Sequence, residues 1–120
     1  MQYALLVYQN ESWDRLSNDE KNRIHEECGA WHEELVQKGI SRACVGLRPP
    51  DMATTVRANG ERALVTDGPF AESKEVLGGL EIVECKNLDE AIAVAKRFPA
   101  LRLGFAMEVR PTTSGGCKEE

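Results

Sequence analysis

The apolar positions of this chain switch between two spacings, and these switches divide it into alternating strands and helices. Short apolar runs predict four strands, at residues 2–8, 40–47, 77–85 and 104–110. Apolar residues at steps of three and four predict two helices, one over residues 18–38 and one between Asn87 and Pro99. Two further strands, at 54–58 and 61–65, flank Asn59-Gly60, a dipeptide typical of a tight hairpin turn.

Both predicted helices begin with a recognisable cap. Ser17 and Glu20 have the spacing of a capping box, and Asn87 is a favoured cap residue for the second helix. Gly39 supplies the left-handed residue that commonly follows a helix. We expect the buried stripes to be Ile24, Cys28, Trp31 and Leu35 on the first helix, and Leu88, Ile92 and Ala95 on the second.

The order of these elements predicts an α+β fold of the ferredoxin-like βαββαβ type with an inserted β-hairpin. Two helices can cover only one face of such a sheet, yet the first strand is apolar on both faces. We therefore expect a homodimer whose sheets pack together, as in a dimeric α+β barrel. The domain is expected to span residues 1–111, followed by a flexible tail over 112–120.

The inserted hairpin has a predicted register of its own. With Asn59-Gly60 as the two turn residues, Val56 faces Ala63 and Arg57 faces Arg62. Two like charges directly opposite each other are mildly destabilising, so we expect both arginines to splay into solvent. The alternative is an anion held between them.

Composition narrows the class of partner. The 120 residues suffice for one domain, and 15 Lys and Arg against 20 Asp and Glu give a net charge of -5. This charge disfavours nucleic acid as a direct partner. No apolar run is long enough to span a bilayer, and the N-terminus lacks a basic region and a cleavage site of a signal peptide. We expect a cytoplasmic protein with no membrane contact.

The four cysteines lack C-x-x-C spacing, which favours plain thiols over a disulfide framework or a zinc site. Cys28, Cys44 and Cys85 fall in apolar segments, where a thiol behaves as a small core hydrophobe. Cys117 lies in a polar tail and is expected to be exposed.

Candidate acid–base chemistry rests first on two histidines of the first helix. His25 and His32 are seven residues apart, which is too far for an i, i+4 metal pair, so we expect no metal. His25 is expected to be solvated. His32 flanks the apolar stripe beside Trp31, where it is either a general base or, more commonly, a boundary histidine with a structural role.

Asp67 is the second candidate, because it precedes Gly68-Pro69. An Asp in a turn usually bonds the amide two residues on, but proline has no N–H. The carboxylate is then free to cap Phe70 or a later amide, or to face a pocket. Four residues are predicted to bind a substrate. Arg48 would bind an anionic group, and Phe70, Glu72 and Lys74 would lie at the mouth of the pocket that Asp67 faces.

The stretch Val65 to Glu75, containing Asp-Gly-Pro-Phe, resembles the signature of the DGPF branch of the YCII-related family. The resemblance extends through Leu77-Gly78-Gly79, through residues 87–95 and to residues 108–111. It implies a ferredoxin-like dimer and an active-site pair of a helix histidine and an aspartate. His32 matches that histidine, and the aspartate corresponds either to Asp51 or to Asp67.

Two functions follow from the residues and the resemblance. The first is small-molecule binding in a cleft, with lyase- or isomerase-like acid/base catalysis by His32 and an aspartate and without metal or other cofactor. One branch of the family removes chloride from a chlorinated hydroxylated aromatic ring. The alternative is a non-catalytic regulatory partner, because members of the DGPF branch often accompany extracytoplasmic-function sigma factors. The acidic residues of the first helix, Glu26, Glu27, Glu33 and Glu34, would suit a basic partner.

Overall fold

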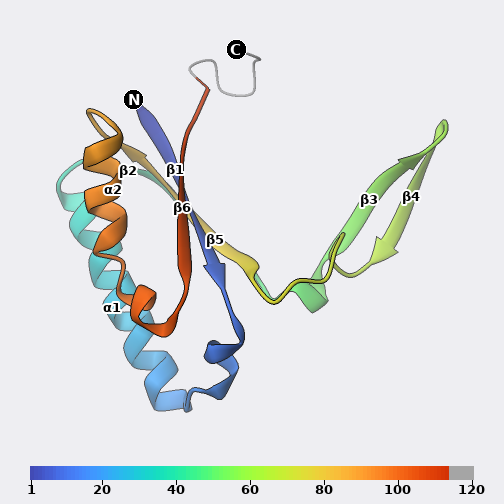
Figure 1. Ribbon diagram of the computed structural model, residues 1–120, viewed down its shortest axis with the longest axis horizontal. Helices are drawn as coiled ribbons and strands as arrows, with labels where there is room; N and C mark the ends of the chain where they lie inside the picture. Colours follow the sequence, from blue (N-terminus) through green and yellow to red (C-terminus); the bar gives the residue numbers. More distant parts are fainter. Residues whose placement is uncertain (114–120) are drawn as a thin grey trace.

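A computed structural model of the chain describes residues 1–113 and places four strands in one antiparallel sheet (Figure 1). The strand order is β2-β5-β1-β6, with β1 and β5 in the centre. This order, with both helices on one face, is the ferredoxin-like α+β arrangement expected from the sequence. The sheet is built from β1 (Gln2–Gln9), β2 (Ser41–Gly46), β5 (Val76–Glu84) and β6 (Ala106–Pro111).

The two helices, α1 (Asn18–Gln37) and α2 (Leu88–Lys96), lie side by side on the sheet (Figure 1). The Ser17–Glu20 capping box is present, and the Asn87 side chain accepts a hydrogen bond from the Glu90 amide. Three short 3₁₀ helices connect the elements: η1 (Glu11–Arg15), η2 (Pro50–Met52) and η3 (Pro99–Leu103). The expected helices and caps are therefore confirmed.

The core lies between the helices and the inward face of the sheet. Trp31 and Leu35 of α1 are buried there as expected, with Ile24 in an adjoining cluster. The stripe expected on α2 is wrong in one respect, because Leu88 is exposed and Ala91 is fully buried. Alanine at the contact lets α2 approach the sheet closely, and Leu88, the first helical residue, turns outward.

The inserted hairpin, β3 (Thr54–Asn59) and β4 (Arg62–Asp67), forms a separate two-stranded sheet that projects from the body as an arm (Figure 1). The expected register is wrong, because the two-residue turn begins at Gly60 and not at Asn59. Asn59 pairs with Arg62 and Val56 with Val65, so Gly60-Glu61 form the turn and the two arginines are not opposite each other. Gly60 has a positive φ of 66° and no non-glycine residue among residues 1–113 does, so glycine takes the first turn position, as in a type II′ turn, and Asn59 stays in the strand.

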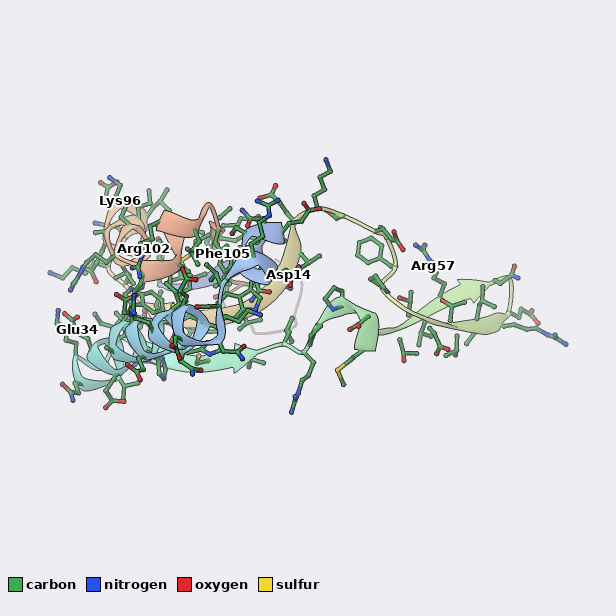
Figure 2. The ribbon with its side chains drawn as sticks, turned by 90° about the horizontal axis from the view of Figure 1, so that it is seen from below. Asp14, Glu34, Arg57, Lys96, Arg102 and Phe105 are labelled. Carbon is green, nitrogen blue, oxygen red and sulfur yellow. The ribbon has the colours of Figure 1, made fainter. Side chains whose placement is uncertain are left out.

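The arm gives the subunit an extended shape. The radius of gyration of the Cα atoms is 16.3 Å, whereas a compact domain of this length has about 14 Å. Figure 2 shows the same arm, with Arg57 on it, reaching away from the helical body that carries Arg102 and Phe105. Neither helix in residues 1–113 combines the length and the apolar character needed to cross a bilayer.

The outer face of the sheet and the C-terminus complete the description. Leu6 is paired with Leu80 and is only half-buried, so apolar side chains remain on the face away from the helices. Just after β6, the amide N–H of Thr112 donates a hydrogen bond to the carbonyl oxygen of Gln2. For residues 114–120, the expected flexible tail and the expected exposure of Cys117 lie outside the described residues.

Candidate functional site

A cavity of about 410 Å³ opens between α1 and the inward face of the sheet. This volume is in the range of small-molecule sites. Most of its wall is apolar and partly aromatic, formed by Val7, Trp13, Ile24, Trp31, Phe98 and Phe105. The largest polar part of the wall is a group of side chains around Glu81, where α1, β2 and β5 meet.

Glu81 is the one charged residue buried within residues 1–113, and its side chain is 3% exposed. His32 Nδ1 lies 2.9 and 3.0 Å from its two carboxylate oxygens. Ser41 Oγ donates a hydrogen bond of 2.5 Å to Oε2. A buried carboxylate is strongly unfavourable unless it is hydrogen-bonded, so these donors are what allow Glu81 to stay in the core.

Strand register brings these groups together. Glu81 occupies an inward position of β5, between Gly79 and Val83. Cys44 of β2 is its direct partner in the ladder and therefore lies on the same face. A β-bulge between Ser41 and Ala43 shifts the register by one residue, which turns the Ser41 side chain to that face as well.

His32 reaches the carboxylate from α1, and its side chain is one-third exposed at the cavity. Trp31, the residue before His32, anchors this helix to α2. Its indole N–H donates a hydrogen bond of 3.2 Å to the carbonyl oxygen of Val94. Because the carboxylate accepts at Nδ1, the neutral imidazole carries its proton there, and Nε2 keeps its lone pair. An imidazole held in this way can accept a proton at Nε2.

Cys44 departs from the expectation of a core hydrophobe. It is exposed on the edge strand β2, whereas Cys28 is half-buried and Cys85 is buried. Although the residue as a whole is exposed, its thiol is partly shielded from water. This desolvation, together with the hydrogen bond to Glu81 and the negative charge of Glu81, raises the pKa of Cys44 to about 11. The thiol is therefore protonated at neutral pH, and it is a further donor to Glu81.

The two expected aspartates lie elsewhere in the subunit. Asp67 is the last residue of β4, paired with Thr54, and Asp51 is in the first turn of η2. Both are exposed, and neither lines the cavity beside His32. Among residues 1–113, the carboxylate at hydrogen-bonding distance from His32 is that of Glu81.

Two of the four expected substrate-binding residues line a second cavity of about 730 Å³, at the base of the arm. Arg48 and Phe70 both line it, and Leu47 lines both cavities, so the two hollows adjoin. Lys74 lines a smaller hollow beside η1, and Glu72 is exposed in the connection to β5. The structure thus places none of these four residues in the wall of the cavity beside His32.

His25 also lines the first cavity, about two helical turns before His32. It is exposed, as expected, and its ring packs on Trp13 with centroids 5.1 Å apart. This aromatic contact connects α1 to η1 at the mouth of the cavity.

The model of the YCII-related domain matches residues 1–113 of the chain. The chain belongs to the YCII-related family. An uncharacterized protein of Rhizobium meliloti (strain 1021) is similar to it, with 36% identity over 97 residues, or 80% of this chain and 78% of the relative. In this YCII-related protein the family resemblance predicted His32 as a site residue, and the fold gives His32 a buried acidic partner.

Sequence reasoning missed Glu81, Ser41 and Cys44 as members of the site. One signal was available for Glu81. Of the two glutamates in the apolar strand LGGLEIVEC, it is the one at an inward position. No comparable signal marked Ser41, because its inward orientation depends on the bulge in β2.

Proposed function

We propose that this protein is a cytoplasmic homodimer that binds a small, largely apolar organic molecule beside His32 and moves a proton to or from it. The observation that carries the proposal is the His32–Glu81 pair in the wall of a mostly apolar cavity. The expected histidine is retained, and Glu81 takes the orienting role that the sequence offered to Asp51 or Asp67.

The chemistry follows from the tautomer of His32. The carboxylate of Glu81 accepts a hydrogen bond from the Nδ1–H group of His32. It thereby stabilises the imidazolium that forms when Nε2 accepts a proton from the ligand. A base placed in this way contributes about 10²–10⁴-fold to the rate of an elimination or isomerisation. The apolar wall favours an aromatic or aliphatic ligand with one acidic proton, such as a phenol or an enolisable carbonyl compound.

The alternative function, a non-catalytic regulator that docks a basic partner on α1, has less support from the charges of that helix. Glu34 is bonded to Lys38 (2.7 Å) and to Arg97 (3.0 Å), and Glu27 pairs with Arg102. Two of the four acidic residues are therefore already neutralised inside the subunit. The hydrogen bonds from Lys38 and Arg97 also lower the pKa of Glu34, which keeps its charge engaged there.

The proposed homodimer rests on two apolar surfaces of the described chain. The outer face of the sheet carries Leu6 and Leu80, and one face of the arm carries the cross-strand pair Val56–Val65. An isolated two-stranded hairpin is at best marginally stable in water, so the arm needs a surface to pack on. A second copy of the chain supplies an apolar face of the same kind, which satisfies both requirements.

The proposed proton transfer is tested with 4-nitrophenol, whose ionised form absorbs visible light. We expect saturable binding to the wild-type protein, with an increase in absorbance of the ionised form below the pKa of free 4-nitrophenol. His32→Gln should bind the phenol without that increase, and Glu33→Gln, on the exposed side of α1, should behave as wild type. Equal ionisation by wild type and His32→Gln would refute the base, and binding without ionisation in both would favour the regulatory alternative.

A further inference from the structure

We propose that His32, Cys44 and Glu81 form a binding site for one thiophilic divalent cation, of which Zn²⁺ is the best match. The histidine pair considered in the sequence could not do this, because His25 and His32 are seven residues apart on one helix. The fold instead supplies the other two ligands from the sheet. The inference does not depend on catalysis, although it uses the same imidazole as the proposed base.

The three ligand atoms are already gathered. His32 Nδ1, Cys44 Sγ and a carboxylate oxygen of Glu81 all lie within 4.8 Å of one another. They come from α1, β2 and β5, so their convergence is a product of the fold and not of a local sequence motif. Among residues 1–113 this is the group of three such side chains that is close enough to share an ion.

The donor types select the class of metal. One imidazole nitrogen, one thiolate sulfur and one carboxylate oxygen suit Zn²⁺, whereas Mg²⁺ and Ca²⁺ prefer oxygen ligands only. Zinc takes four ligands at about 2.0–2.3 Å, and sites with three protein ligands keep the fourth position open to water or ligand. Here the open position would face the cavity that the same three side chains line.

The surroundings also fit an ion site. Cys44 is exposed on the edge strand, which gives an ion a route of entry and gives the thiol room to adjust. Ser41 Oγ donates to Oε2 of Glu81, a contact of the kind that orients metal-bound carboxylates. Glu81 leaves one negative charge buried, and Cys44 adds a second when it loses its proton, so the divalent charge is balanced.

Binding has a defined proton balance. The cation displaces the proton of the Cys44 thiol into solvent, and it displaces the proton from His32 Nδ1. The neutral imidazole then carries its proton on Nε2, where it can no longer accept one. Metal binding and the proposed base function therefore exclude each other, and the cation would act as an inhibitor of proton transfer at His32.

The test is a titration of chelator-treated, reduced protein with Co²⁺, followed by displacement with Zn²⁺. We expect one Co²⁺ per chain, a thiolate-to-cobalt charge-transfer band, and the intense visible bands of tetrahedral coordination, all abolished by one equivalent of Zn²⁺. Cys44→Ser should lose the charge-transfer band and bind at least tenfold more weakly. Weak, octahedral-type Co²⁺ spectra, or unchanged affinity in Cys44→Ser, would overturn the proposal.

The matched control changes two other cysteines, Cys28→Ser and Cys117→Ser together, and should retain the charge-transfer band and the affinity. Loss of the band in this control would assign the metal to another thiol and overturn the site. Cys44 is exposed, so Cys44→Ser should keep the wild-type circular dichroism spectrum and melting temperature. Because these readouts use the metal alone, they stand or fall separately from 4-nitrophenol ionisation, which is measured in the presence of chelator.

Discussion

His32 and Glu81 are 49 residues apart in the sequence, yet the imidazole Nδ1 lies 2.9 Å from a carboxylate oxygen of Glu81. The contact joins α1 to a central strand of the sheet and places a polar group in a mostly apolar cavity. The carboxylate depends on its donors, because a buried acceptor left without a partner costs free energy of folding.

Removing the imidazole should therefore destabilise the fold as well as the site. We expect His32→Ala to lower the free energy of unfolding by about 1–3 kcal/mol, because Glu81 loses a donor while staying buried. His32→Gln, which keeps an N–H donor, should recover part of the loss. Urea unfolding at pH 7 measures both, with Glu33→Ala on the exposed side of α1 as the control. A loss in His32→Ala no larger than that in Glu33→Ala would contradict the structural role of the pair.

The thiol of Cys44 provides an independent probe of the Glu81 charge. Burial and Glu81 raise the pKa of Cys44 to about 11, so its thiolate fraction at pH 8 is about two orders of magnitude below that of an ordinary cysteine. The higher nucleophilicity of a more basic thiolate offsets part of this, which leaves alkylation about tenfold slower. We therefore expect iodoacetamide to alkylate Cys44 about tenfold more slowly in the folded protein than in the urea-unfolded protein, both measured in the presence of chelator.

The sign of the charge effect can be tested on the same peptide. Glu81→Gln removes the negative charge that disfavours the thiolate, so it should lower the pKa of Cys44 and speed its alkylation at pH 8. Ser41→Ala keeps the charge and should leave the rate slow. Mass spectrometry of the Cys44 peptide gives both rates, and equal rates in Glu81→Gln and wild type would remove Glu81 as a cause.

Local signals were sufficient to predict most of the fold. The capping box at Ser17, the cap at Asn87 and the positive φ of Gly39 are decided within a few residues of chain, and each is present. The register of the hairpin was not predictable in the same way. Both Asn59-Gly60 and Gly60-Glu61 place glycine in the turn, and the choice between them depends on pairing along both strands.

The site was predictable only in part, because it depends on contacts between distant segments. His32 could be selected from its place on α1 and from the family resemblance. Its partner could not, because Glu81 reaches it only once β5 lies beneath α1. The presence of Ser41 at the carboxylate depends further on a one-residue bulge in β2, for which the sequence carries no turn or glycine signal.

The Gly78-Gly79 pair lies both at a β-bulge and at a close approach of two backbones. The register of β1 with β5 shifts at this point, from Val7 opposite Gly79 to Tyr8 opposite Leu77. A Cβ on Gly79 would lie 2.8 Å from the carbonyl oxygen of Val45, which is backbone of the neighbouring strand and cannot yield cheaply. A side chain here would push β2, and with it Cys44, away from Glu81.

Gly79→Ala should accordingly lower the free energy of unfolding by about 1–3 kcal/mol, as overpacking does. It should also weaken the Co²⁺ binding proposed for Cys44. Gly78→Ala is the matched control, since the atoms nearest to its Cβ would belong to the flexible side chain of Gln9 and not to backbone. Denaturant titration compares the two variants, and equal losses would show that the backbone contact with Val45 is unimportant.

The arm provides the test of the proposed homodimer, because its two faces differ in character. Val56 and Val65 are directly paired, 65% and 61% exposed, and they share a face with the Ala58–Ala63 pair. Thr66 is the next residue of β4 and is exposed on the opposite face. Strand alternation thus offers two adjacent exposed positions on opposite sides of the arm.

If a second copy covers the valine face, a charge there must be desolvated on association, whereas a charge at Thr66 remains in water. We expect the wild-type protein to sediment as a dimer at micromolar concentration, Val65→Asp to raise the dissociation constant at least tenfold, and Thr66→Asp to leave it unchanged. Sedimentation velocity over a concentration series measures all three. A monomeric wild type would refute the dimer, and equal weakening by both variants would place the contact away from the valine face of the arm.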